Sequence, residues 1–266
     1  MIQTPRINAE RIKQYLEQGK RFDGRSPYEY RDVIIETGIS KNAEGSARVR
    51  IGETDVVVGV KMDVSEPYPD SPDEGNLMVG AELLQLSSPR FEGGKPGFDA
   101  IEVGRIVDRG IRESKYIDFG KLCIKDGEKV WTVFIDIYSI NDDGNILDAA
   151  GIGAIAALKD ARIPKYDEKE EKVVYGEWTT KKIPLQKDAP LPITFHKIGN
   201  RFLIDPTKEE EDIREARITI GSSDGIISSM QKGDEKEISI EELNEVLDVV
   251  EKIWKDLNSK IDKNLK

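Results

Sequence analysis

The chain has 266 residues, of which 38% are hydrophobic, and a formal net charge of −11 at pH 7. This length and apolar fraction suffice for one large domain or two smaller ones, whereas the negative charge excludes a protein that coats nucleic acid with its whole surface. One cysteine, Cys123, and one histidine, His196, exclude an internal disulfide and a Cys/His zinc site.

The first elements predicted along the chain are a short helix and an antiparallel sheet. Residues 1–5 lack the pattern of a signal peptide and no later stretch is apolar enough to span a membrane, so we expect a cytoplasmic protein. Asn8 is the expected N-cap of an amphipathic helix that ends at Gly19. Period-two hydrophobicity then predicts three strands, the last two joined by a hairpin turn: Asp32–Thr37, Ser46–Ile51 and Val56–Val64.

Helices and strands alternate in the middle of the chain. Residues 63–77 are rich in proline and acidic residues, which predicts a loop. Asp99 and Glu102 have the spacing of a capping box and predict a helix that ends near Ser114. Pro164 is expected to close the unit after one more strand and one buried helix, which are predicted at Lys129–Ile140 and Ile146–Leu158.

The C-terminal part predicts a second sheet and a long helix. The almost wholly charged residues 165–172 mark a linker with room for one hairpin around Val173–Trp178. Strands are predicted at Pro192–Phe195, Arg201–Ile204, Ile213–Ile220 and Ile226–Met230. Ser239 and Glu242 form a capping box for the last helix. Its apolar residues recur at three and four positions, and a helix packed on its own sheet is favoured over a coiled coil.

These elements divide the chain into four parts. We expect an N-terminal helix over residues 1–19 and a first domain over residues 20–164. A linker over residues 165–190 is expected to connect it to a second domain over residues 191–266.

Several short motifs occur in order along the chain. Residues 21–25 (RFDGR) resemble the entry motif of the ribonuclease PH family, and residues 45–47 followed by 52–56 resemble its next pair of strands. Residues 107–114 (VDRGIRES) resemble the signature of the inactive ring subunit of an archaeal-type RNA exosome, and residues 140–150 continue the likeness. The resemblance covers most of the chain.

This resemblance implies a ribonuclease PH-like α+β fold of two related units, each a sheet backed by helices. It also implies the partners. They are a catalytic ribonuclease PH-type paralogue that alternates with this chain in a ring, as a trimer of heterodimers, the RNA-binding cap proteins of the exosome, and RNA. Neither a membrane nor a cofactor nor a metal is implied.

Active members of the family hold phosphate with a Gly-Ser/Thr-Arg loop that opens a helix, because helix N-termini bind anions and Arg grips phosphate through two hydrogen bonds. The matching positions here are Asn145, Ile146 and Leu147. Ile and Leu offer no donor, so a desolvated phosphate would lack positive partners at this loop. The resemblance therefore predicts a degenerate phosphate loop.

Active members also carry two aspartates six residues apart after a short turn, one of which acts as general acid or binds magnesium. The corresponding residues here are Glu211 and Arg217, so the second charge is reversed. With the register shifted by one residue, Asp212 and Ile218 take these places and the pair is still absent. Residues 209–212 form an acidic run, which we expect to be a solvated turn rather than a metal site because adjacent carboxylates repel one another.

Other catalytic interpretations have less support. Residues 151–156 match a G-x-G-x-x-A dinucleotide fingerprint but fall inside the predicted helix, so close packing is favoured over an oxidoreductase. His196 has no Ser or Cys nucleophile near it in a motif and is expected to be structural or exposed. Cys123 is expected to be buried in a strand. The tryptophans are expected in the core or at an interface: Trp131, Trp178 and Trp254.

One basic cluster lies on the predicted helix before Ser114. Arg105, Arg109 and Arg112 share one face of it, opposite the apolar residues that face the core. Taken alone, this stripe is explained by pairing with Glu102 and Asp108, at about 0.2–0.5 kcal/mol per pair. In the inactive subunit that the chain resembles, arginines of this helix face the partner's active site and grip RNA phosphates. Arg109 and Arg112 are therefore candidate RNA-binding residues, with a smaller share for Arg105.

Two functions remain in view. The preferred one is a subunit without chemistry of its own, needed for assembly and RNA binding in phosphorolytic 3′-to-5′ degradation by its catalytic partner. The alternative is an active phosphorolytic 3′-to-5′ exoribonuclease. The two differ at Ile146, Leu147 and Arg217, and these residues favour the first.

Overall fold

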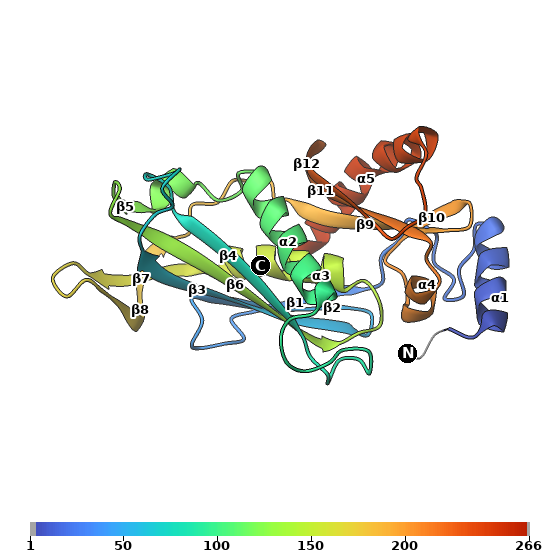
Figure 1. The fold of residues 1–266 in the computed structure, drawn as a ribbon, viewed down its shortest axis with the longest axis horizontal. Helices are drawn as coiled ribbons and strands as arrows, with labels where there is room; N and C mark the ends of the chain where they lie inside the picture. Colours follow the sequence, from blue (N-terminus) through green and yellow to red (C-terminus); the bar gives the residue numbers. More distant parts are fainter. Residues whose placement is uncertain (1–3, 265–266) are drawn as a thin grey trace.

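The computed structural model describes residues 4–264. In it, two β-sheets enclose a pair of helices (Figure 1). Helices α2 (Phe98–Glu113) and α3 (Ile146–Asp160) contact strands of both sheets. Residues 1–3 of the expected N-terminal helix segment and residues 265–266 of the expected second domain lie outside the described residues.

The first sheet has the strand order β1-β2-β3-β6-β4, with β5 paired to β6. Its strands are β1 (Val33–Thr37), β2 (Gly45–Ile51), β3 (Thr54–Ser65), β4 (Asn76–Leu83), β5 (Cys123–Lys125) and β6 (Lys129–Asn141). Neighbouring strands are antiparallel except β4, which runs parallel to β6. The sequence did not predict β4, and the expected loop at 63–77 is shortened at both ends. Gly80 interrupts the apolar run of β4 and leaves little alternation to recognise.

The second sheet has the strand order β10-β9-β11-β12. Its strands are β9 (Leu191–Ile198), β10 (Arg201–Ile204), β11 (Ala216–Ser223) and β12 (Ile226–Gly233). A separate hairpin joins β7 (Arg162–Asp167) to β8 (Lys172–Lys182) and is longer than predicted. Pro164 lies within β7 rather than closing the preceding unit, and the pairing shifts register on both sides of it, which is how a strand tolerates proline.

The remaining helices are α1 (Arg6–Glu17), the 3-10 helix η1 (Phe119–Leu122), α4 (Lys208–Asp212) and α5 (Ile240–Asn264). Figure 1 places α1 at one end of the molecule and the β7–β8 hairpin at the other. Helix α5 contacts β9, β11 and β1, in agreement with the predicted helix on its own sheet. The indole nitrogen of Trp254 in α5 donates to the Ala189 carbonyl at 2.9 Å.

The helix caps agree only in part with the sequence signals. The capping box of α5 forms, since the Ser239 N–H donates to Glu242 at 2.8 Å and the Glu242 N–H to the Ser239 hydroxyl at 3.2 Å. Helix α1 starts two residues before Asn8, with Pro5 as its N-cap. Gly97 is the N-cap of helix α2 and makes no side-chain hydrogen bond, so the capping box predicted from Asp99 and Glu102 is wrong. The Glu102 side chain contacts the second sheet instead.

Small residues let α3 pack closely between the sheets. A Cβ on Gly151 would lie 2.2 Å from the Pro192 side chain, and one on Gly153 would lie 2.7 Å from Val58. The two glycines of the G-x-G-x-x-A string therefore serve packing, as predicted, and lie within the helix rather than at its start.

The three tryptophans and Cys123 differ in their burial. The side chains of Trp131 and Trp254 are buried, whereas Trp178 on the β7–β8 hairpin is 44% exposed. Cys123 is only partly buried, which corrects the expectation of a core cysteine. It begins the short strand β5, which pairs only with β6 in the described part of the chain.

Candidate functional site

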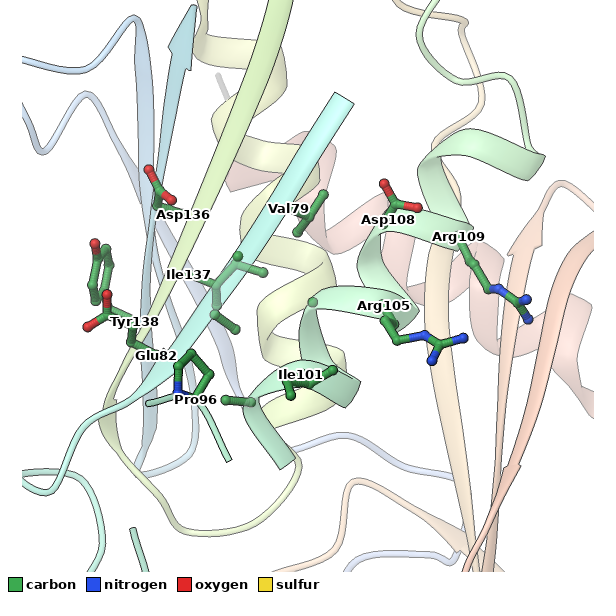
Figure 2. A pocket seen from close by; sticks show the side chains of 14 residues that line it. Val79, Glu82, Pro96, Ile101, Arg105, Asp108, Arg109, Asp136, Ile137 and Tyr138 are labelled. Atoms are coloured by element: carbon green, nitrogen blue, oxygen red, sulfur yellow. The ribbon is translucent and has the colours of Figure 1, made fainter. Parts of the chain in front are cut away.

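The predicted arginine stripe lies on the exposed side of α2. Arg105, Arg109 and Arg112 are all exposed. Figure 2 shows Arg105 and Arg109 extending from the same side of the helix. The apolar residues on its other side are buried, as predicted: Ile106, Val107 and Ile111.

Local pairing accounts for only part of this stripe. Arg112 donates to Asp108 at 2.8 Å and to the Leu77 carbonyl at 3.1 Å. Within residues 4–264, neither Arg105 nor Arg109 forms an ion pair with a carboxylate. The smaller RNA-binding share expected for Arg105 from the sequence stays a prediction.

Glu102, the other expected partner of the stripe, contacts the second sheet instead. It forms an ion pair with Arg217 of β11 and accepts a hydrogen bond from Gln231 at 2.9 Å. Gly233 leaves room for this arrangement, because a Cβ there would lie 2.8 Å from the guanidinium carbon of Arg217. Arg217, predicted as the second residue of a degenerate acid pair, is thus a buried cation that connects α2 to the second sheet.

A groove of about 520 Å³ runs beside α2 along the edge strand β4 (Figure 2). Arg105 and Arg109 line it from the helix, and Glu82 and Asp136 line it from the sheet. Burial, reinforced by the nearby Glu82 carboxylate, raises the pKa of Asp136 above its ordinary value. A polyanion is attracted to the helix side of this groove and repelled by the strand side.

The three residues predicted to be a degenerate phosphate loop lie at the start of α3. Asn145 is its N-cap, in a left-handed conformation with φ of 65°, and is buried. Ile146 is buried as well, and Leu147 packs half-buried against the core. The preceding Gly144 has φ of 84°, and a Cβ there would lie 2.5 Å from the Pro206 carbonyl oxygen. This loop is thus pressed against the segment that leads into α4.

A carboxylate of the chain itself occupies the start of α3. The Asn145 N–H donates to an oxygen of Glu211 at 3.3 Å. Three cations surround the same carboxylate, namely Arg90 at 3.2 Å, Lys208 at 3.2 Å and Arg214 at 3.4 Å. Burial alone would raise the pKa of Glu211, but these cations lower it well below its ordinary value. Glu211 is therefore ionised in the folded chain.

The acidic run 209–212 is not the solvated turn that the sequence predicted. It forms the short helix α4, in which the side chains of Glu210 and Glu211 are buried. Glu210 reaches back to the Thr207 N–H at 2.9 Å in a capping box and forms an ion pair with the buried Arg21. The buried carboxylates are stable here because each has cationic partners.

The RFDGR motif has a structural role beside this site. Arg25 pairs with the buried Asp205 at 2.8 Å, and Arg31 pairs with the same carboxylate at 2.8 Å. Burial would raise the pKa of Asp205, but hydrogen bonds and charge from Arg31 and Arg25 lower it below its ordinary value. Asp205 also accepts from the Asn145 amide at 2.9 Å, so the motif holds the α3 loop in place.

His196 is buried in β9, directly opposite Arg217 of β11. Within residues 4–264, neither of its ring nitrogens has a hydrogen-bond partner. Burial, with the nearby charge of Arg214, lowers the pKa of His196 to about 3. The ring is therefore neutral at physiological pH, in agreement with the predicted structural role.

No metal or membrane site emerges from the described part of the chain. Within residues 4–264, no three His, Cys, Asp or Glu side chains are arranged to hold a metal ion. In the same residues, no helix has the length and apolarity that a membrane crossing requires.

Four residues of the site were missed by reasoning from sequence. Lys208 and Arg214 lie three residues either side of Glu211, a spacing that predicts ion pairs along a helix turn and could have been recognised. Arg90 and Asp142 come from distant loops, and no local pattern connects them with α4. They form an ion pair at 3.0 Å.

Both halves of the chain match models of a known protein family. Residues 29–164 match the model of the 3′ exoribonuclease family, domain 1, and residues 188–252 match domain 2 of the same family. The chain belongs to the 3′ exoribonuclease (ribonuclease PH) family. The predicted α+β fold of the ribonuclease PH type is thereby confirmed.

Curated relatives of this family are similar over nearly the whole chain. Exosome complex component Rrp42 of Methanothermobacter thermautotrophicus is 44% identical over 94% of this chain and 92% of its own length. The protein of the same name from Thermococcus gammatolerans is 45% identical over 91% of this chain and 89% of its own. The resemblance to an archaeal exosome ring subunit, drawn from motifs, is thus confirmed at the level of whole chains.

Solved structures give the same result. A chain of an Archaeoglobus fulgidus exosome with RNA bound to the active site is 41% identical, with a TM-score of 0.87 over 96% of this chain and 97% of that chain. A chain of an archaeal exosome core is 39% identical, with a TM-score of 0.84 over 96% of both chains.

Proposed function

We propose that this chain is a subunit of an archaeal exosome ring, without catalytic activity of its own, that supports assembly and RNA binding during phosphorolytic 3′-to-5′ degradation. The names of its relatives and the RNA-bound exosome among the similar structures support the assembly. One observation carries the non-catalytic part: the start of α3 holds the Glu211 carboxylate in place of a free anion site. A phosphate nucleophile has no vacant place there.

The partners follow from the same proposal. A catalytic paralogue alternates with this chain in a ring of three heterodimers, in the cytoplasm, and cap proteins deliver RNA to it. Arg105, Arg109 and Arg112 bind RNA phosphates on the exposed side of α2. Because phosphate contacts do not depend on base sequence, they allow RNA of any sequence to bind. We retain the division into residues 20–164 and 191–266 as two units joined by the 165–190 linker.

The alternative is an active phosphorolytic exoribonuclease. It requires a phosphate loop with donors and a carboxylate at each position of the acid pair. Here Ile146 and Leu147 offer no donor, and Arg217 is engaged with Glu102. The surroundings of Glu211 also count against it, because an ionised carboxylate cannot act as a general acid.

The test is an assay of the purified full-length chain. We expect no shortening of RNA with inorganic phosphate and no extension with nucleoside diphosphates above background. The same assay on the co-assembled ring should give robust turnover that depends on the paralogue. Release of nucleoside diphosphates by this chain alone, abolished in Glu211→Gln, would establish the alternative.

A further inference from the structure

The first sheet has an outer face that the helices leave uncovered. Side chains alternate along β6, so Ile135 and Ile137 are buried on the side of α2 and α3, whereas Asp136 between them is exposed on the opposite side. The same alternation holds in the neighbouring strands β3 and β4. Figure 2 shows Asp136 and Tyr138 on the opposite side of β6 from Ile137, which points toward α2. This outer face is open to a partner.

Asp136 lies in a hollow of this face. Its cross-strand neighbours are Gly59 of β3 and Gly80 of β4, which have no side chains to fill the space beside it. A Cβ on Gly59 would have no heavy atom within 4 Å beyond its chain neighbours, so the hollow is open on that side. Along β6, Phe134 and Tyr138 lie on the same face as Asp136, one before it and one after it. The carboxylate is thus bordered by two glycines and two aromatic rings.

The carboxylate in this hollow lacks a cation. Within residues 4–264, neither Asp136 nor Glu82, its diagonal neighbour on β4, forms an ion pair. Burial and the Glu82 carboxylate raise the pKa of Asp136, and no cation counters them. Cations on the adjoining strands are engaged with other carboxylates: Lys61 with Glu44 at 2.9 Å and Arg48 with Asp55 at 2.6 Å. A positive charge for Asp136 has to come from outside the described chain.

We propose that this hollow receives an arginine side chain of the catalytic paralogue when the ring assembles. The inference rests on the proposed ring and adds a specific contact to it. A guanidinium carries several N–H donors in a planar fork, so one arginine can bridge Asp136 and Glu82. Its plane also stacks on aromatic rings such as those of Phe134 and Tyr138. The adjoining glycines leave room for its methylene stem.

The charge and the position of the hollow favour this occupant over others. Two carboxylates repel RNA phosphates, so RNA does not bind here. Within residues 4–264, no third carboxylate, histidine or cysteine joins the pair to hold a metal ion. Asp136 and Glu82 line the strand side of the groove that Arg105 and Arg109 line from α2. A subunit that approaches α2 across the edge strand β4 therefore reaches the hollow as well.

The experiment compares Asp136→Asn with Asp126→Asn in the full-length chain, each co-expressed with the catalytic paralogue. Both substitutions remove one charge from an exposed aspartate, but Asp126 lies in the turn between β5 and β6, away from the hollow. Mass photometry of a dilution series gives the concentration at which half of the rings dissociate. We expect Asp136→Asn to raise this concentration at least about tenfold, as for the loss of one partner of a desolvated charge pair. Asp126→Asn should behave like the wild type.

A second variant, Gly59→Leu, fills the hollow without changing its charge. The new side chain extends into open space, and the φ of Gly59 is not in the left-handed region, so the isolated chain should still fold. We expect it to weaken the ring as Asp136→Asn does. Thermal unfolding of the isolated chain separates this role from a structural one. Asp136→Asn should unfold at the same temperature as the wild type or a higher one, because it removes repulsion from Glu82.

The inference requires both substitutions at the hollow to weaken the ring. It is overturned if either Asp136→Asn or Gly59→Leu assembles like the wild type, or if Asp126→Asn weakens the ring equally, which would assign the effect to net charge. A lower unfolding temperature of isolated Asp136→Asn also overturns it, since the carboxylate would then serve the fold. Failure of the wild-type chain to assemble with the paralogue would contradict the proposed function itself, so the two failures are distinguishable.

Discussion

The charge of His196 links a single buried side chain to stability in acid. Its pKa is lowered to about 3 by burial, from an ordinary value near 6.5. At any pH between these two pKa values, His196 is protonated in the unfolded chain but neutral in the folded chain. Stability is fully present above about pH 6.5 and is lost progressively as the pH falls toward 3.

We predict that His196→Leu makes the chain less sensitive to acid. Between pH 6.5 and pH 5, the wild type should lose about 1.6 kcal/mol more unfolding free energy than the variant, since the slope rises from half to nearly all of 1.36 kcal/mol per pH unit over this range. Urea unfolding at both pH values measures this difference. Asp148, whose pKa burial raises to about 6, gains stability over part of the same range, but it does so in both proteins and cancels. Equal losses in the two proteins would show that His196 titrates normally in the folded chain.

At the scale of elements, α2 joins the candidate RNA-binding face to the second sheet. Its exposed side carries Arg105 and Arg109 without ion pairs in residues 4–264, while Glu102 is fixed by Arg217. The helix is thus anchored on one side and free to meet a polyanion on the other. A rigid element holds such contacts in register better than a loop does.

We predict that Arg105→Gln with Arg109→Gln weakens RNA binding by the assembled ring regardless of base sequence. Each phosphate contact to a single strand contributes about 0.7 to the slope of log affinity against log salt, so losing two should lower the slope by about 1.4. Fluorescence anisotropy of labelled RNA at several salt concentrations measures both quantities.

The matched control for this double variant is Arg6→Gln with Arg11→Gln on α1. These arginines are also exposed and lie on a helix at the far end of the molecule (Figure 1). The control should keep the wild-type slope. If both double variants change affinity and slope equally, or neither does, Arg105 and Arg109 do not bind RNA and the RNA-binding role of α2 is wrong.

Periodic elements could be predicted from the sequence, whereas features set by contacts between distant segments could not. The buried side of α2, the α3 packing glycines and most strands followed from local spacing. Strand β4 was missed because its interrupted apolar run gives no clear period, although pairing with β6 fixes it. The burial of Glu211 was also missed. A run of four acidic residues predicts a solvated turn, and the sequence does not show that the fold places Arg90 beside Glu211.

At the scale of the whole molecule, large apolar side chains are exposed at the start of α2 and in the loop before it, and one of them, Ile101, lines the groove beside α2. Phe98 is 78% exposed and Ile101 is 52% exposed, both in the first turns of the helix. Leu86 in the preceding loop is 78% exposed. Exposed apolar side chains that gather in one place mark an interaction surface. Since Arg105 and Arg109 line the same groove, a subunit that covers this face would also meet RNA there.

We predict that the chain co-expressed with its catalytic paralogue forms particles of about six chains, three of each, because alternating heterologous contacts close into a ring. Light scattering coupled to size-exclusion chromatography measures the mass.

Phe98→Asp should reduce this mass to that of smaller species without lowering the thermal stability of the isolated chain, because the Phe98 side chain is exposed before assembly. Ile226→Asp, at a residue 71% exposed at the start of β12, is the matched control and should leave the ring intact. A stable homohexamer that refuses the paralogue would rule out the alternating ring, and an intact ring in Phe98→Asp would place the subunit contact elsewhere.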